Sequence, residues 1–122
     1  MKKRRRASAA RLHTIADLCI IPIGVGVSLS EFISVAYRII AKSGLKHELH
    51  ANGTNVEGEY DLVCATLRRC IEELHALGVP RVTCTIKLGT RVDRVQSMVE
   101  KVASVLRRDA KPKQRRAART RR

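Results

Sequence analysis

Chemically useful side chains are concentrated in one short segment, residues 51–59. The segment combines the amide of Asn52, the hydroxyl of Thr54 and the carboxylate of Glu57 just before the start of a predicted helix. Such groups exchange hydrogen bonds with a polar ligand, and the carboxylate can balance a positive charge on it. The segment is therefore the best candidate for a ligand-facing element. For Glu57 a structural alternative stays open, because together with Gly58 it could simply cap the helix that follows.

Polar residues in the first and last predicted strands are further candidates. Asp17 lies among apolar residues, where a charge is costly unless the carboxylate is paired or meets a cationic ligand. The structural alternative for Asp17 is a pair with a Lys or Arg at the strand edge. Thr83 and Thr85 lie on the side of the last strand that faces away from the core, either as a pocket wall or as an ordinary solvated face.

An Asn-Gly dipeptide places a tight turn within the 51–59 segment. Asn52-Gly53 is typical of a type I′ hairpin, because both central residues of that turn need positive φ, which Asn tolerates and Gly adopts freely. We therefore predict paired strands at residues 45–51 and 54–57.

Two amphipathic helices are predicted on either side of this hairpin. The first begins at Ser28, where Ser28 and Glu31 have the spacing of a capping box, and it ends at the stop signals Lys42 and Gly44. The second covers about residues 60–77, with apolar residues at three- and four-residue spacing.

The order of the predicted elements defines an α+β fold. A strand at residues 15–22, the first helix, the hairpin, the second helix and a strand at residues 81–88 follow one another, and a third helix covers about residues 92–106. This β-α-β-β-α-β order is that of the ferredoxin-like sandwich, here with an antiparallel four-stranded sheet and an added C-terminal helix. The first strand is apolar on both sides, so the second face of the sheet needs a cover, either the third helix or another subunit.

The positive charge is confined to the ends of the chain. At 122 residues and 44% hydrophobic composition, the chain allows one domain with one core. Of the 25 Lys and Arg residues, six lie in residues 1–14, nine in residues 107–122, and ten in the segment 15–106, which also holds ten of the 11 acids. We therefore predict a neutral domain at 15–106 between two basic disordered tails.

Cysteines and histidines show no metal-binding pattern. The four cysteines form no C-x-x-C pair and lie in apolar stretches, which favours buried free thiols over metal ligands or disulfides. No apolar run is long enough to span a membrane, and no signal-peptide region precedes the domain. We expect a cytoplasmic protein, with a nuclear location as the alternative because of the basic runs.

Three segments resemble a known family. Residues 16–24, 49–61 and 85–94 are similar to the small thiamine-binding protein family of ferredoxin-like fold, and most similar to its eukaryotic, fungal-type branch. The resemblance covers about residues 15–106. It implies subunits that pair through their sheets into dimers or tetramers. It also implies binding of thiamine or its hydroxymethyl-pyrimidine moiety rather than catalysis, with no cofactor beyond that ligand.

The candidate residues suit such a ligand. Thiamine combines a cationic thiazolium with an aminopyrimidine, so its pocket needs a carboxylate, a hydroxyl or amide, and apolar walls. Lys87 and Arg91 could hold the phosphate of a phosphorylated form, or simply lie at the surface. The candidate ligand-binding residues are Asp17, Asn52, Thr54, Glu57, Thr83, Thr85, Lys87 and Arg91.

Three other functions compete with ligand binding. RNA-recognition domains share the β-α-β-β-α-β order, but they stack bases on strand aromatics, and the aromatic residues here fall in or at helices. Nonspecific attraction of nucleic acid by the basic tails remains open. A structural assembly protein without a small ligand is also possible. An enzyme has little support, because no nucleophile motif or phosphate-binding glycine loop is present.

Overall fold

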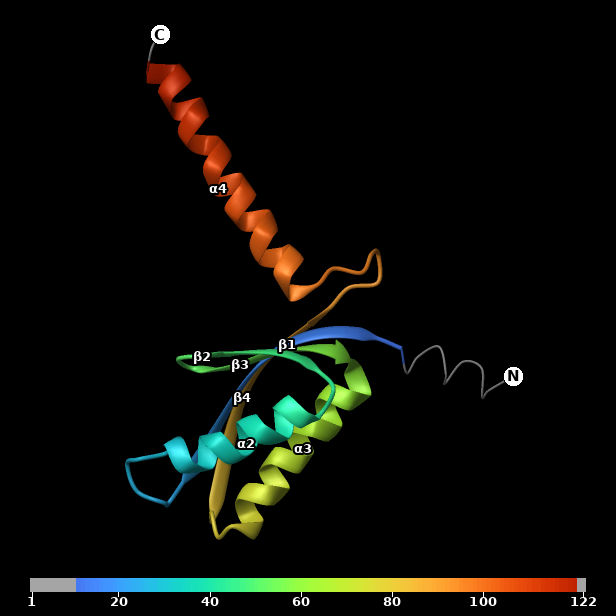
Figure 1. Ribbon diagram of the computed structural model, residues 1–122, viewed down its shortest axis with the longest axis vertical. Coiled ribbons are helices and arrows are strands. Elements are labelled where there is room, and N and C mark those ends of the chain that lie inside the picture. Colours follow the sequence, from blue (N-terminus) through green and yellow to red (C-terminus); the bar gives the residue numbers. More distant parts are fainter. Residues whose placement is uncertain (1–10, 121–122) are drawn as a thin grey trace, which may run out of the picture.

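The computed structural model describes the backbone of residues 11–120 and the side chains of residues 11–110, so most of the predicted N-terminal tail lies outside it. Four strands and three helices follow in the predicted order (Figure 1). They are β1 (His13–Ile23), α2 (Ser30–Lys42), β2 (Lys46–His50), β3 (Gly53–Glu59), α3 (Tyr60–Ala76), β4 (Arg81–Thr90) and α4 (Met98–Thr120).

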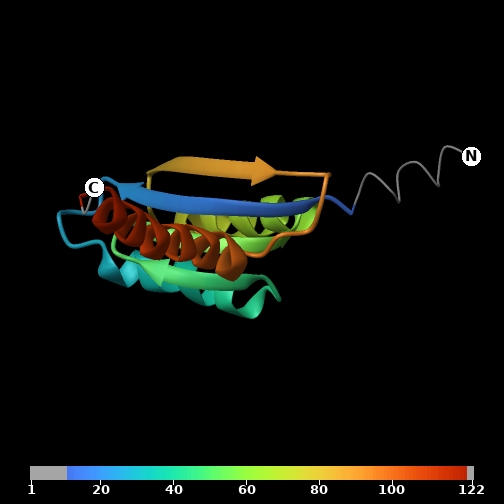
Figure 2. The ribbon, with the colours of Figure 1, turned by 90° about the horizontal axis from the view of Figure 1, so that it is seen from above.

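The sheet has the strand order β2-β3-β1-β4, and every neighbouring pair is antiparallel. This is the predicted α+β, ferredoxin-like arrangement. Helices α2 and α3 cover one face of the sheet, and α4 lies on the other side; in Figure 2, which looks down on the sheet, α4 is on the near side.

Alternation along β1 explains why the core lies on one face. Buried and half-buried residues alternate over His13–Ile23, so Ala16, Leu18 and Ile20 all point toward α2 and α3. They meet buried residues such as Ile40 of α2. Each large apolar side chain buried in this way contributes about 1.5–3 kcal/mol.

The hairpin forms, but its predicted turn type is wrong. His50 pairs with Gly53, so the turn residues are Ala51 and Asn52 rather than Asn52 and Gly53. No non-glycine residue in the described chain has positive φ, and Gly53 does not have it either. Gly53 is needed for a different reason: a Cβ atom there would lie only 2.7 Å from the carbonyl oxygen of Leu18.

Helix starts also differ from the prediction. Helix α2 begins at Ser30, its N-cap is Leu29, and no side chain caps it, so the predicted capping box of Ser28 and Glu31 is wrong. Helix α3 begins at Tyr60 as predicted, but its cap is Glu59, whose carboxylate accepts hydrogen bonds from backbone N–H groups of the first turn.

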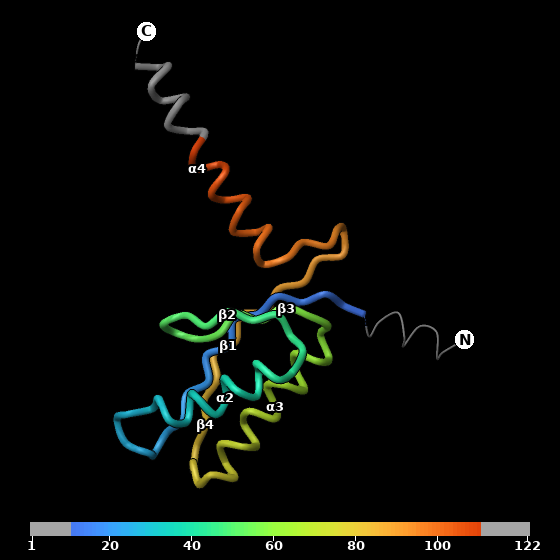
Figure 3. The backbone as a smooth tube through the Cα atoms, in the orientation of Figure 1, coloured from blue at the N-terminus to red at the C-terminus, as the bar shows by residue number. Residues whose placement is uncertain are grey.

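Helix α4 starts later and extends further than predicted. It begins at Met98, not near Val92, and it continues through Thr120 into the segment that the sequence assigned to a basic tail. Its first turn lies next to the sheet, and the helix then leads away from the sandwich (Figures 1 and 3). Val102 and Leu106 on this helix are 61% and 63% exposed.

The four cysteines are free, but their burial differs from the prediction. Only Cys70 is buried; Cys19 and Cys84 are partly buried and Cys64 is exposed. Burial raises the pKa of the Cys70 thiol to about 11. Within the described residues, no group of three His, Cys, Asp or Glu side chains could hold a metal ion. None of the helices in this part of the chain is long and apolar enough to cross a membrane.

Candidate functional site

A cavity of about 260 Å³ opens between α2, the β2–β3 turn and the second half of β1. We call it the hairpin cavity. Its walls are mainly apolar, and hydrogen-bonding side chains come from the turn region and from α2. The lining residues include Leu18, Ile20, Ile33, Ala36, Ile40 and Leu49 among the apolar ones, and Tyr37, His50, Asn52 and Thr54 among the polar ones.

Main-chain groups of β1 face this cavity because β1 is longer than β3. β1 pairs with β4 as far as Ile23, but with β3 only as far as Leu18. The carbonyl of Leu12 accepts a hydrogen bond from Tyr60 just beyond β3, so the even-numbered main-chain groups of β1 point toward β3. Because these groups alternate sides along a strand, the N–H and C=O of Ile20 point into the space beyond the end of β3.

The next even-numbered residue supports this picture. Pro22 occupies the same unpaired edge, where its missing N–H costs no ladder hydrogen bond. The edge of β1 therefore offers the cavity one donor and one acceptor at Ile20.

Thr54 adds a hydroxyl to the same cavity. The residue is only 6% exposed, yet we find no hydrogen bond for its hydroxyl among the described residues. Among the described residues, every side-chain N or O atom that is fully inaccessible to solvent has a hydrogen-bond partner. Because the Thr54 hydroxyl has none, its oxygen must be accessible to solvent. Thr54 lines the hairpin cavity, so the hydroxyl is accessible from there. It can donate to or accept from a ligand.

Asp17 and His50 form a pair in which His50 also lines the hairpin cavity and Asp17 lies on the second face of the sheet. The Asp17 carboxylate accepts a hydrogen bond from His50 Nε2 at 2.7 Å, and His50 Nδ1 accepts from the backbone N–H of Asn52 at 3.2 Å. These partners assign the neutral tautomer with the proton on Nε2. Asp17 is thus paired, as its structural alternative required, but with a histidine rather than with the Lys87 that lies opposite it on β4. The pair ties β1 to the turn that borders the cavity.

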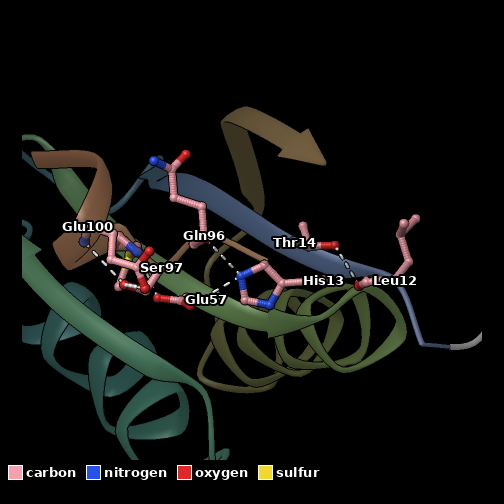
Figure 4. A network of polar contacts seen from close by, with 8 residues as sticks. Leu12, His13, Thr14, Glu57, Gln96, Ser97 and Glu100 are labelled. Atoms are coloured by element: carbon pink, nitrogen blue, oxygen red, sulfur yellow. Dashed lines mark hydrogen bonds and ion pairs between the residues drawn. The ribbon is translucent and has the colours of Figure 1, made fainter. Parts of the chain in front are cut away.

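Glu57 belongs to a separate network that holds α4 (Figure 4). Its side chain is 6% exposed; one oxygen accepts from the Met98 N–H at 2.9 Å, and the other lies 3.1 Å from His13 Nε2. Glu57 therefore caps a helix, but the helix is α4 rather than α3. Ser97 and Glu100 complete this helix start, because the Ser97 hydroxyl accepts from the Glu100 N–H at 3.1 Å.

Asp17 and Lys87 line a second cleft, of about 290 Å³, between the sheet and the first turns of α4. We call it the α4 cleft. Asn55, Lys101 and Val102 line it as well. Its amide and ammonium groups could contact a polar ligand, but its position on the second face of the sheet separates it from the hairpin cavity.

The remaining candidates lie elsewhere. Arg91 lines a small adjoining cavity and is occupied by Asp93 and Gln96. The hydrogen bond from Arg91 lowers the pKa of the Asp93 carboxyl to about 2. Thr83 and Thr85 are exposed on β4 and line neither the hairpin cavity nor the α4 cleft.

Of the eight predicted residues, the structure brings Asn52 and Thr54 together at the hairpin cavity, and it places Asp17 and Lys87 in the α4 cleft on the other face of the sheet. Sequence reasoning missed Tyr37, His50 and the main chain of Ile20. The main chain of Ile20 could have been found from strand lengths. The second hairpin strand ends opposite Leu18, so the longer β1 continues without a partner on that side.

These features define a ferredoxin-like α+β protein with a small cavity at the end of its hairpin. Residues 16–106 match the model of the family described as "Thiamine-binding protein". The chain belongs to this family, as the sequence resemblance predicted.

Several relatives extend the comparison. UPF0045 protein sll0230 of Synechocystis is 48% identical over 101 residues, which covers 83% of this chain and 82% of the relative. The fungal UPF0045 protein ECM15 of Eremothecium gossypii is 35% identical, with 76% and 90% covered.

Solved structures share the fold. The hypothetical protein MJ1052 of Methanocaldococcus jannaschii superimposes with a TM-score of 0.71 at 28% identity, covering 76% of this chain and 95% of its own. TM0486 of Thermotoga maritima, described as a putative thiamine biosynthesis/salvage protein, gives a TM-score of 0.66 at 20% identity, with 76% and 98% covered.

Proposed function

We propose that this protein binds thiamine, or its hydroxymethyl-pyrimidine moiety, in the hairpin cavity and catalyses no reaction on it. The observation that carries the proposal is the unpaired main-chain edge of Ile20, with the Thr54 hydroxyl in the same apolar cavity. An aminopyrimidine is a flat ring with donors and acceptors on its rim. Its amino group would donate to the Ile20 carbonyl, and a ring nitrogen would accept from the Ile20 N–H.

The volume of the cavity favours the pyrimidine ring as the buried part. Sites for drug-sized ligands have about 300–1,000 Å³, and the hairpin cavity has about 260 Å³. One ring would fill its interior, and the thiazolium would lie at the mouth. His50 lines the cavity, and its hydrogen bond to Asp17 on the other face of the sheet would bring a screened negative charge near the cation.

The surroundings give little support for catalysis. Both ring nitrogens of His50 are already engaged, by Asp17 and by the Asn52 N–H. Its imidazole is therefore not free to act as a general base toward a molecule in the cavity.

Calorimetric titration with thiamine, thiamine diphosphate and free hydroxymethyl-pyrimidine tests this function. Loss of one hydrogen bond is worth about 0.5–1.5 kcal/mol, so Thr54→Val should weaken binding of the pyrimidine about 2- to 10-fold. Thr85→Val is the matched control, because it makes the same change outside the cavity. Absence of binding by all three compounds would leave a structural assembly protein.

We also propose that a second copy of the chain covers the second face of the sheet. On this face, Ile15 and Ile21 of β1 are partly exposed and Ile23 is 39% exposed, and the apolar side of α4 is exposed as well. Large apolar residues gathered on one face are typical of an interface. A dimer or tetramer would bury them, whereas a strictly monomeric mass in light scattering would exclude it.

A cytoplasmic location stays a prediction from the sequence. A fluorescent fusion that changes compartment only when the basic ends are removed would instead assign those ends a targeting role.

A further inference from the structure

Helix α4 carries a concentration of positive charge that ligand binding does not use. Over Met98–Thr120 it holds eight Lys and Arg residues and only two acids, Glu100 and Asp109. Lys101, Arg107 and Arg108 are exposed, and none of them has a carboxylate within 4 Å in the part of the chain whose side chains are described. One of the two acids, Glu100, is engaged at the start of the helix by Ser97.

The basic positions follow the period of the helix. With 3.6 residues per turn, positions 101, 108, 111, 115 and 119 fall along one side of the α4 backbone, and all five are Lys or Arg. Positions 99, 102 and 106, which are Val, Val and Leu, fall on the opposite side. Over residues 98–108, α4 therefore separates charge from apolar surface, whereas further along the helix Lys113 falls on the same side of the backbone as positions 102 and 106.

We propose that the basic side of α4 binds the phosphate backbone of double-stranded DNA, without reading its sequence. The five positions span about 27 Å at 1.5 Å per residue, and a duplex presents one negative charge per roughly 1.7 Å of its axis. A helix about 10–12 Å across fits the major groove of B-form DNA, which is about 12 Å wide, whereas the major groove of A-form RNA is deep and narrow.

The position of α4 suits this partner. The helix leads away from the sandwich, so a long rod can lie along it without meeting the sheet (Figure 1). Its apolar side has Val and Leu at positions 99, 102 and 106, and the helix has no Trp or Phe to anchor it in a lipid interface. Covering of the apolar side by a second copy would leave positions 108, 111, 115 and 119 open, so this inference and the proposed oligomer are compatible.

Fluorescence anisotropy of the full-length protein with a labelled duplex of about 20 base pairs tests the inference. Five phosphate contacts give a log–log salt slope of about −4.5, so affinity should fall about 500-fold between ~50 and ~200 mM salt. The triple variant Arg108→Gln, Arg115→Gln, Arg119→Gln should bind more weakly and reduce the fall to about 10-fold.

A matched variant separates this site from general charge attraction. Arg68→Gln, Arg69→Gln and Arg81→Gln remove the same charge from exposed positions on α3 and β4, and the salt slope should not change. Calorimetric ligand binding by both variants would show that each remains folded. Four results would overturn the proposal: no binding to the duplex, an equal loss of slope in the control, equally tight binding of an A-form RNA duplex, or preferential capture by vesicles of anionic lipid.

Discussion

Gly53 and Asp17 approach each other so closely that a Cβ atom on the glycine would lie 3.0 Å from the Asp17 carboxylate oxygen. The same atom would lie 2.7 Å from the carbonyl of Leu18, which is backbone and cannot move aside. The glycine of the hairpin is therefore required for close approach between strands, and the Asp17–His50 pair depends on it.

Gly53→Ala should accordingly destabilise the protein by about 1–3 kcal/mol, the usual cost of overpacking. Urea unfolding followed by circular dichroism measures this loss. Gly89→Ala is the control, because a Cβ atom there meets nothing within 4 Å and its φ is not positive. Equal stability of the two variants would contradict the steric role of Gly53.

Asp17→Asn should separate the two parts of the ligand. The substitution removes a half-exposed charge but keeps an oxygen that can accept from His50, so affinity for cationic thiamine should fall up to about 5-fold, as for a surface charge pair. Affinity for the neutral pyrimidine should stay within about 2-fold. Calorimetry measures both, and Asp109→Asn on α4 makes the same charge change far from the cavity. An equal loss of affinity for thiamine and for the neutral pyrimidine would show that the Asp17 charge does not act on the thiazolium.

Glu57→Ala should loosen the start of α4. It removes the acceptor of the Met98 N–H and leaves His13 without its carboxylate, at a cost of about 1–2 kcal/mol. Amide hydrogen exchange should speed up in the first turn of α4. Glu59→Ala removes the cap of α3 instead, so it should speed exchange at Asp61 and Leu62 and leave α4 unchanged.

Cys70 should make stability depend on pH above neutrality. Its folded pKa of about 11 exceeds the ordinary value of 9.0, so the folded state holds this proton more tightly than the unfolded state. The resulting stabilisation is complete below pH 9 and is lost as pH rises toward 11. Cys70→Ala should flatten the fall in unfolding free energy over this range, measured in urea.

Val99→Glu should dissociate the proposed oligomer. The residue lies on the apolar side of α4 and is 76% exposed, and it does not line the α4 cleft, where Lys87 and Lys101 could pair with a new carboxylate. Light scattering should show a lower mass than for the unaltered protein. Val92→Glu makes the identical change at a position that is 90% exposed before α4, and it should keep the original mass.

Sequence patterns predicted the fold because its main signals are local. The apolar run of β1, the alternation in β4 and the three- and four-residue spacing in α2 and α3 each extend over many residues, so single errors do not change the order of elements. Helix starts depend on one or two residues. Ser28–Glu31 and Ser97–Glu100 have the same capping-box spacing, yet only the second forms the hydrogen bonds, because Glu57 and His13 fix the start of α4 from the sheet.

The site was harder to predict because its parts come from distant segments. His50 reaches Asp17 across 33 positions of sequence, and no local pattern connects them. Thr54 and Asn52 were recognisable from their own chemistry. The unpaired main-chain edge at Ile20 could not be recognised in this way, because every residue has a main-chain N–H and C=O and the residue type does not show which of them are unpaired.

The early end of β3 also bears on how this protein can change over time. A donor and an acceptor supplied by the main chain survive substitution of Ile20 by most other residues, whereas a side-chain donor would be lost by a single mutation. The walls of the hairpin cavity can therefore be exchanged residue by residue while its hydrogen-bonding edge persists. If the cavity binds the proposed ligand, the protein can acquire affinity for other ring-shaped molecules without first losing affinity for that ligand.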